Sequence, residues 1–204
     1  MRDYTPPAEP QLSRRHVLAA TSAAVMSLLA FPLTPAQAQG QPAMHLGQIS
    51  SVLRQPRLRG EAQLRFFGFS VYQARLWTEP EFEASAYADH PLVLELLYAR
   101  SLQSEAIAER SLTEMQRGRT ISREQGSTWL AAMRRTFPDV SEGDRLTGMY
   151  RPGQATHFEF NGQLRAPVND KAFGPAFFGI WLAESTSEPA MRRQLLGLDT
   201  KAPR

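Results

Sequence analysis

The segment Pro91–Arg100, PLVLELLYAR, limits the possible folds of this chain more than any other stretch. Because successive side chains of a strand point to opposite faces, this segment presents two largely apolar faces. The first face carries Leu92, Leu94, Leu96 and Tyr98, and the second carries Val93, Glu95 and Leu97. A strand that is apolar on both faces needs cover on both sides. We therefore expect this segment to be a central strand of a sheet and not an edge strand.

A second region, residues 60–77, also predicts β-structure. Its sequence, GEAQLRFFGFSVYQARLW, is rich in the aromatic and β-branched residues that favour strands. Gly68 interrupts the run, so the segment forms either two short strands or one long strand that bends at the glycine.

A hairpin is predicted in the second half of the chain. Residues 145–151 and 155–160 alternate in the manner of strands, and the second of these segments leads into Asn161-Gly162. An Asn-Gly pair favours a type I′ turn because both residues tolerate positive φ. We therefore expect residues 163–168 to run antiparallel to 155–160.

Four segments have helical patterns with recognisable start signals. The first is 104–117 with Ser104 as candidate N-cap, and Ser122 opens the second through a capping box. Asp170 can cap the third, and Pro189 lies in the first turn of the fourth. The resulting order of strands, two helices, strands and two helices predicts an α+β domain. We expect an antiparallel sheet with helices packed on one face.

The first 38 residues predict an export signal. Ser13-Arg14-Arg15 precedes an uncharged stretch, 17–31, that runs into Ala36-Gln37-Ala38. A charged start, an apolar middle and an A-x-A end are typical of a signal peptide, and the paired arginines resemble the twin-arginine type that exports folded proteins. An uncleaved anchor is the alternative, although the stretch is shorter than the ~20 apolar residues of a usual span. We expect cleavage after Ala38, a periplasmic location, a domain at 39–198 and a tail at 199–204.

Composition excludes several kinds of site. The 204-residue chain contains no cysteine, which excludes disulfides, thiolate nucleophiles, Cys-ligated zinc and iron–sulfur clusters. The net charge is only +3 and no basic block is present, so nothing indicates nucleic-acid binding. Neither a phosphate loop nor a dinucleotide glycine fingerprint occurs, and we expect no cofactor and no metal. The mature chain has no further apolar run of membrane length, and its oligomeric state stays open.

The histidines and the main acidic cluster give no recognisable site. His45, His90 and His157 of the mature chain belong to no catalytic or metal-binding motif. The acidic residues of segment 139–144 lack the ligand spacing of an EF-hand loop. Turn formation is the ordinary explanation for such a cluster.

Four residues are candidates for holding a carboxylate or phenol. Tyr98 and Arg100 share one strand face, and a phenolic hydroxyl beside a guanidinium can hold a carboxylate or enolate oxygen. Tyr72 and Arg65 are seven residues apart, so only a bend or bulge near Gly68 brings them together. Packing is the alternative role for each. Glu95, set among leucines, must be paired with an arginine, hydrogen-bonded, or shifted in pKa, and pairing is the simpler interpretation.

Several motifs together resemble the bacterial chalcone isomerase-like proteins. The likeness spans most of residues 48–197 in consistent order. Its motifs are LRFFGFSVYQARLW (64–77), LVLELLYAR (92–100), Gly143-Asp144, Asn161-Gly162, FFGIWL (177–182) and Leu195-Leu196-Gly197. This resemblance implies an open antiparallel sheet, helices layered against it, and a cleft between the sheet and the helices.

The resemblance implies less about activity. The plant isomerases use an arginine before the long strand, a threonine on it, and a tyrosine, lysine and asparagine near a helix. Here residues 101–117 contain no Tyr, Lys or Asn. In this chain Ser70 corresponds most nearly to the threonine. Arg59 or Arg65 corresponds most nearly to the arginine. Related plant proteins without isomerase activity bind fatty acids through an Arg and a Tyr.

The leading hypothesis is therefore a periplasmic, non-catalytic protein that binds a small apolar carboxylate or phenol, such as a fatty acid, through Arg65, Tyr72, Tyr98 and Arg100. One alternative is an isomerase, an intramolecular lyase, acting on a chalcone-like unsaturated ketone with Tyr98 or Glu95 as proton donor or acceptor. Another is an envelope scaffold that docks a partner protein on the aromatic residues of segment 177–181.

Overall fold

The computed structural model describes residues 49–199. Within this range the sheet has six strands in the order β1-β2-β3-β4-β5-β6, each antiparallel to its neighbour. The strands are β1 Arg57–Phe66, β2 Phe69–Thr78, β3 Leu92–Tyr98, β4 Arg145–Tyr150, β5 His157–Phe160 and β6 Gln163–Leu164. Strand β3 lies between β2 and β4, which confirms the prediction of a central strand. The predicted signal peptide lies outside the described residues, as does nearly all of the predicted tail.

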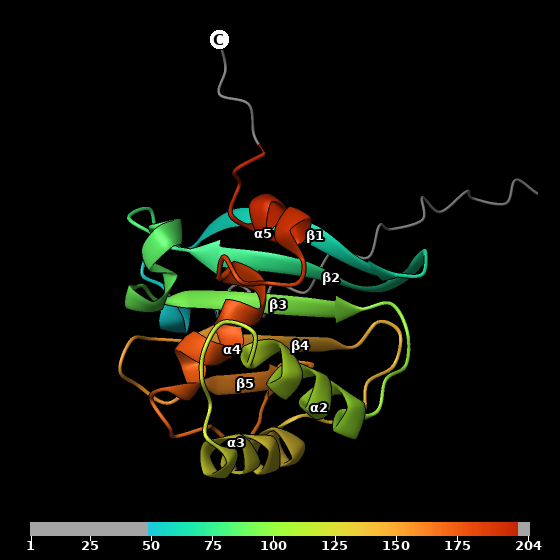
Figure 1. The fold of residues 1–204 in the computed structure, drawn as a ribbon. Helices are drawn as coiled ribbons and strands as arrows, with labels where there is room; N and C mark the ends of the chain where they lie inside the picture. Colours follow the sequence, from blue (N-terminus) through green and yellow to red (C-terminus); the bar gives the residue numbers. More distant parts are fainter. Residues whose placement is uncertain (1–48, 200–204) are drawn as a thin grey trace, which may run out of the picture. The chain divides into compact units, whose positions relative to one another are not determined.

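Helices cover one face of the sheet (Figure 1). They are η1 Ala84–Asp89, α2 Ser104–Met115, α3 Arg123–Thr136, α4 Phe173–Leu182 and α5 Pro189–Leu195. Helix α5 packs on β1, while α2 packs against both α3 and α4. The predicted α+β class, with an antiparallel sheet and helices on one face, is confirmed. None of the helices in the described range combines the length and the apolar character needed to cross a membrane.

Every second side chain of a strand points toward the helices, and the register of the sheet aligns these side chains in rows across neighbouring strands. Ala62, Ala74, Leu96 and Leu146 lie side by side in one such row. These residues are buried beneath the helices and belong to the main hydrophobic core. Because the strand period is two residues, the intervening positions point to the opposite face.

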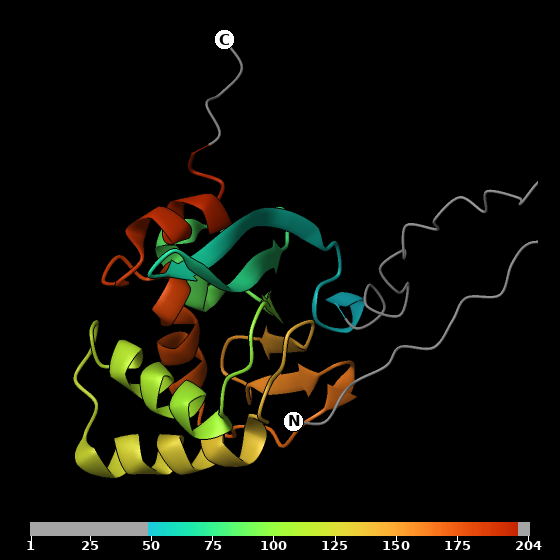
Figure 2. The same cartoon turned by 90° about the vertical axis from the view of Figure 1, so that its right-hand side faces the viewer.

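The opposite face is covered at one end by a short helical segment, residues 49–52 (Figure 2). Ile49 and Leu53 pack there against Val93 and Met149 to form a second, smaller core. Both faces of β3 are therefore buried. This cover explains why β3 carries apolar side chains on both of its faces.

Two hairpins have turns of two residues with positive φ. Phe67 and Gly68 connect β1 to β2, with φ of 48° and 81°, so segment 60–77 forms two strands and not one bent strand. Asn161 and Gly162 connect β5 to β6 with nearly the same angles, 50° and 82°. The second hairpin is confirmed, but its returning strand ends at Leu164. Beyond it, an isolated bridge between Thr156 and Val168 continues the pairing.

Two of the expected helix caps differ from the structure. Ser104 is the first residue of α2 and not its N-cap, and its backbone N–H donates to Asp139 Oδ1 at 2.7 Å. Asp170 lies one turn before α4, where its carboxylate accepts from the N–H of Ala172 and from Trp129 Nε1. Ser122 does cap α3, since its hydroxyl accepts from the Gln125 N–H at 3.1 Å. The acid at the start of α2, Asp139, is distant in sequence, so the local pattern could not locate it. Asp170 bonds the N–H of Ala172 just before α4 and does not bond an N–H of the helix itself.

Candidate ligand-binding cavity

A cavity of about 430 Å³ lies between the sheet and the helices. Its floor is formed by β2, β3 and β4, which contribute Tyr72, Leu96, Tyr98 and Leu146. Its walls are formed by α2, α4 and α5, which contribute Ile107, Phe177, Ile180, Trp181 and Met191. Most of these side chains are apolar. The cleft that the sequence resemblance implied is therefore present in the structure.

Two tyrosines lie next to each other on the floor of the cavity. Tyr72 of β2 pairs with Tyr98 of β3, and their rings meet edge to face with centroids 5.9 Å apart. The Tyr72 hydroxyl accepts a hydrogen bond of 3.0 Å from Trp181 Nε1 of α4. No hydrogen-bond partner for the Tyr98 hydroxyl is found among residues 49–199. Both hydroxyls can therefore donate a hydrogen bond to an acceptor in the cavity.

Burial shifts the pKa of both phenols. It raises the pKa of Tyr72 well above its ordinary value, although the hydrogen bond from Trp181 opposes this effect. Burial also raises the pKa of Tyr98, and the neighbouring Tyr72 adds to the shift. Both groups stay neutral in ordinary buffers. They act as hydrogen-bond donors and not as proton acceptors.

The charged side chains around the cavity differ in whether they are compensated. Glu114 of α2 is buried. Its carboxylate oxygens lie 2.7 Å from Arg110 Nη2 and 2.9 Å from Arg117 Nε. Arg100, just beyond the end of β3, is exposed and also borders the cavity. Within the described part of the chain Arg100 forms no ion pair. It is the cation that remains available to an anionic ligand group.

Three of the four candidate residues border the same cavity, namely Tyr72, Tyr98 and Arg100. Arg65 does not border it. Arg65 pairs with Ser70, and its Nε donates to Gln63 Oε1 on the other face of the hairpin. A register irregularity follows Leu64, as the sequence allowed, but it leaves Leu64 and not Arg65 beside Tyr72. The prediction that Arg65 belongs to the ligand site is therefore corrected, because the pairing register puts its side chain on the other face of the hairpin.

Glu95 lies outside the cavity as well. Its neighbours Leu94 and Leu96 face the helices, so its carboxylate points to the opposite face, where it is buried. Arg75 and Arg145 approach its carboxylate oxygens to 3.8 and 3.9 Å. Burial raises the pKa of Glu95, and these two arginines oppose the shift. Pairing with arginine, the simpler interpretation, matches this geometry.

The aromatic face proposed for docking a partner protein is internal. Phe177, Phe178 and Trp181 are only 4%, 0% and 6% exposed. Phe177 and Trp181 face the cavity, and Phe178 packs on Tyr150. The scaffold hypothesis therefore loses the surface on which it was based.

Sequence reasoning missed the helical residues of the site. Arg110, Glu114 and Arg117 are spaced by four and three residues, which places them on one helix face. That spacing signals an ion-pair cluster but does not show that two of its members, Arg110 and Glu114, border a cavity. No group of three or more His, Asp or Glu side chains within residues 49–199 is placed to hold a metal ion.

Comparison with known families agrees with this architecture. The model of a family described as chalcone isomerase-like matches residues 53–197, from the end of the first helical segment to the end of α5. The chain belongs to this chalcone isomerase-like family. The match includes the whole sheet, all the helices that line the cavity, and both hairpins.

Two individual proteins show how far the similarity extends. An uncharacterized protein of Haemophilus influenzae is 30% identical over 142 residues, which cover 68% of this chain but slightly less than two thirds, 66%, of that protein. The crystal structure of a fatty-acid binding protein of Arabidopsis thaliana superposes with a TM-score of 0.53 at 12% identity, covering 70% of this chain and 87% of the other. At this low identity the second comparison supports the fold alone.

Proposed function

We propose that this protein binds an apolar carboxylate, such as a fatty acid, in the cavity without converting it. The observation that carries the proposal is an apolar cavity with two neutral phenol donors on its floor and, at its edge, Arg100, which forms no ion pair within residues 49–199. Its volume of about 430 Å³ falls within the ~300–1,000 Å³ of small-molecule sites. The fatty-acid binding protein of Arabidopsis thaliana shows that a protein of this fold can hold a ligand of this class.

The arrangement of polar groups fits recognition of a carboxylate. A carboxylate offers several lone pairs and accepts hydrogen bonds from hydroxyl and guanidinium donors at once. Tyr98 supplies a hydroxyl without a protein partner in residues 49–199, and Tyr72 supplies a second hydroxyl that Trp181 orients. The hydrocarbon part of the ligand would lie against Leu96, Phe177 and the other apolar lining residues.

The same geometry disfavours an isomerase. A general acid or base works best with a pKa near the working pH, whereas burial raises the pKa of Tyr98 far above it. Glu95, the other candidate, is on the opposite face of the sheet. Ser70 and Arg59, which correspond most nearly to isomerase residues, are also away from the cavity. The Ser70 hydroxyl accepts from Gln63 Nε2, and Arg59 Nε donates to the Leu196 carbonyl. Neither residue is among the described residues that line the cavity.

The proposal predicts that Tyr98→Phe weakens binding of dodecanoate by roughly tenfold to a hundredfold, because a hydrogen bond to a charged group contributes about 1.5–3 kcal/mol. Isothermal titration calorimetry with the wild type and the variant measures the change. Dodecanol is the matched ligand control, since it has the same chain without the carboxylate and should bind both proteins almost equally.

Two outcomes would count against the proposal. Equal affinity of both proteins for dodecanoate would place the carboxylate away from Tyr98. Loss of chalcone absorbance faster than in buffer alone, and slower in Tyr98→Phe, would favour the isomerase instead.

We further propose that the chain is exported to the periplasm by the twin-arginine-like signal and cleaved after Ala38. The support is the sequence of residues 13–38. The expected result is a periplasmic protein that begins at Gln39, as shown by mass spectrometry of its N-terminal peptide. Replacing both Arg14 and Arg15 by lysine should leave an unprocessed chain in the cytoplasm. An intact N-terminus in the membrane fraction of the wild type would instead identify an uncleaved anchor.

A further inference from the structure

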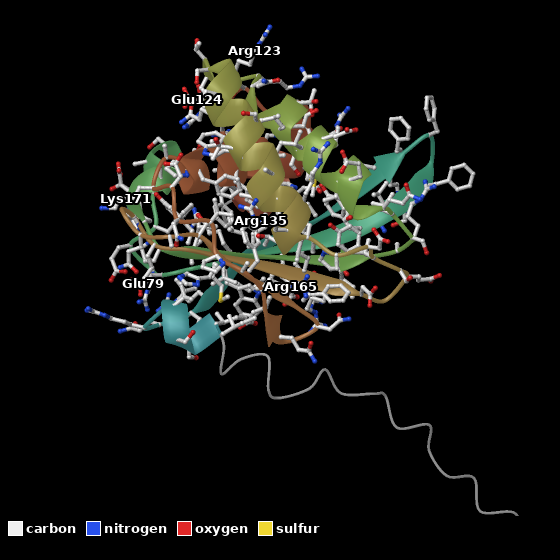
Figure 3. The ribbon with its side chains drawn as sticks, turned by 90° about the horizontal axis from the view of Figure 1, so that it is seen from below. Glu79, Arg123, Glu124, Arg135, Arg165 and Lys171 are labelled. Atoms are coloured by element: carbon white, nitrogen blue, oxygen red, sulfur yellow. The ribbon has the colours of Figure 1, made fainter. Side chains whose placement is uncertain are left out.

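The tip of the β1–β2 hairpin exposes a cluster of phenylalanines. Phe66, Phe67 and Phe69 are 59%, 85% and 71% exposed, and the rings of Phe66 and Phe67 pack on each other with centroids 4.4 Å apart. Figure 3 shows rings at this end of the hairpin standing away from the rest of the molecule. Single exposed apolar residues are common, but a contiguous apolar cluster at the surface usually marks an interaction site.

The backbone at the tip makes the cluster more unusual. Phe67 occupies the first position of the turn with φ of 48°, a left-handed conformation that is unfavourable for a bulky side chain. The other two-residue hairpin of this protein places Asn161 at the equivalent position with φ of 50°, which is the ordinary choice. Phe67 therefore costs conformational energy, and its exposed ring contributes little packing in return. Folding gives no reason for a phenylalanine here.

We propose that the Phe66–Phe69 tip inserts into the surface of a lipid bilayer. Phenylalanine side chains partition into the boundary between headgroups and acyl chains, and a narrow protruding turn can enter that layer. Arg65, exposed beside the tip, is placed to approach anionic headgroups. This proposal does not depend on which ligand the cavity holds.

The size of the cluster favours a bilayer over a second protein. The three rings together expose on the order of 400 Å² of surface, since a phenylalanine can bury at most about 200 Å². A stable protein interface buries roughly 800 Å² on each partner. The tip alone is too small for such an interface, whereas insertion into lipid requires only the protruding rings.

The tip is also continuous with the cavity. Phe66 borders the cavity together with Leu64 and Val71 from the same hairpin. A tip inserted in a bilayer would therefore hold this side of the cavity close to the lipid surface. A bilayer is the occupant that accounts for both the exposed rings and their position beside an apolar cavity.

The absence of cysteine from the chain permits a site-specific test. In the full-length Phe67→Cys variant, an environment-sensitive nitrobenzoxadiazole label at position 67 should show a several-fold rise and a blue shift in emission with vesicles of phosphatidylethanolamine and phosphatidylglycerol. A label in Leu164→Cys, at a residue 70% exposed beside the other hairpin turn, should stay unchanged. The label is the primary readout because the uncharged stretch 17–31 can itself partition into lipid.

Substitution of the tip gives the second measurement. Phe67→Asn copies the residue found in the other hairpin, so it should unfold at the same or a higher urea concentration than the wild type. It should also partition into the vesicles about tenfold more weakly, whereas Leu164→Asn should partition like the wild type. Comparison with phosphatidylcholine vesicles measures the part of the affinity that depends on anionic headgroups.

Each remaining outcome would overturn the proposal. A label at position 67 that stays in water while the protein binds vesicles would assign the binding to another segment. A protein that does not bind vesicles would exclude the bilayer as occupant. A label that responds to protein concentration without lipid, together with dimers in sedimentation, would identify a second copy of the chain as the partner.

Discussion

Leu96→Trp is expected to weaken binding of dodecanoate strongly while leaving the protein folded. Leu96 lies on β3 with its side chain on the floor of the cavity, between Ala74 and Leu146 of the neighbouring strands. An indole at this position occupies space that the ligand needs. Calorimetry should show affinity reduced at least about tenfold, because the ligand must give up its apolar contacts to fit. The midpoint of thermal unfolding should stay the same or rise, since filling a cavity stabilises by about 0.5–2 kcal/mol.

The same substitution two residues away should have the opposite effect on stability. Leu94 points to the same face of β3 as Leu96 and is buried, but it is not among the described residues that line the cavity. It pairs with Gly148, where even an added Cβ would meet the Phe178 ring at 3.1 Å. Leu94→Trp is therefore expected to cost about 1–3 kcal/mol of unfolding free energy through overpacking. Tight binding of dodecanoate by Leu96→Trp would show that the ligand site lies elsewhere.

Regular alternation explains why the sheet could be predicted from the sequence. The two apolar faces of segment 91–100 are a local pattern, so they predict a central strand without knowledge of its neighbours. For the same reason Tyr98 and Arg100 could be assigned to one face of one strand. The Asn161-Gly162 turn was similarly predictable because asparagine and glycine are the residues that most readily adopt the positive φ angles of such a turn.

The parts of the site that depend on packing could not be predicted. Arg65 lies on the face away from the cavity because Leu64 pairs with Tyr72, and the register irregularity after Leu64 does not bring Arg65 to the face of Tyr72. This register is decided by pairing across the hairpin. The wall residues Ile107 and Trp181 face the cavity only because of the way in which α2 and α4 pack over the sheet, which is not a local pattern of the sequence. The sequence left open whether the chain turns or only bends at Gly68, because phenylalanine is not a usual residue at the positive φ that Phe67 adopts.

The contact between α5 and the sheet predicts the second large effect. A Cβ at Gly60 of β1 would lie 2.2 Å from the backbone oxygen of Gln194 and 2.5 Å from that of Leu195. These atoms belong to the helix backbone, so no side-chain rotation can relieve the clash, and α5 must move away from the strand. Gly60→Ala is therefore expected to cost about 3 kcal/mol of unfolding free energy, at the upper end for overpacked sites.

Gly126→Ala is the matched control, because the same chemical change should there have the opposite sign. Gly126 lies in the first turn of α3, where an added Cβ has only ordinary contacts at 3.7 Å and beyond. Alanine should stabilise the helix by about 0.5–1 kcal/mol. Urea unfolding of both variants under one set of conditions measures the two signs. Equal stability of Gly60→Ala and the wild type would contradict the close packing of α5 on β1.

The displacement of α5 should also reach the ligand site. Met191 of the same helix forms part of the cavity wall, so a helix forced outward removes apolar contacts from the ligand. Gly60→Ala should therefore weaken dodecanoate and dodecanol alike, whereas Tyr98→Phe should weaken only dodecanoate. This difference separates a loss of the wall from a loss of the carboxylate donor, because only the second depends on the charge of the ligand. Equal weakening of both ligands by Tyr98→Phe would mean that Tyr98 shapes the cavity and does not bind the carboxylate.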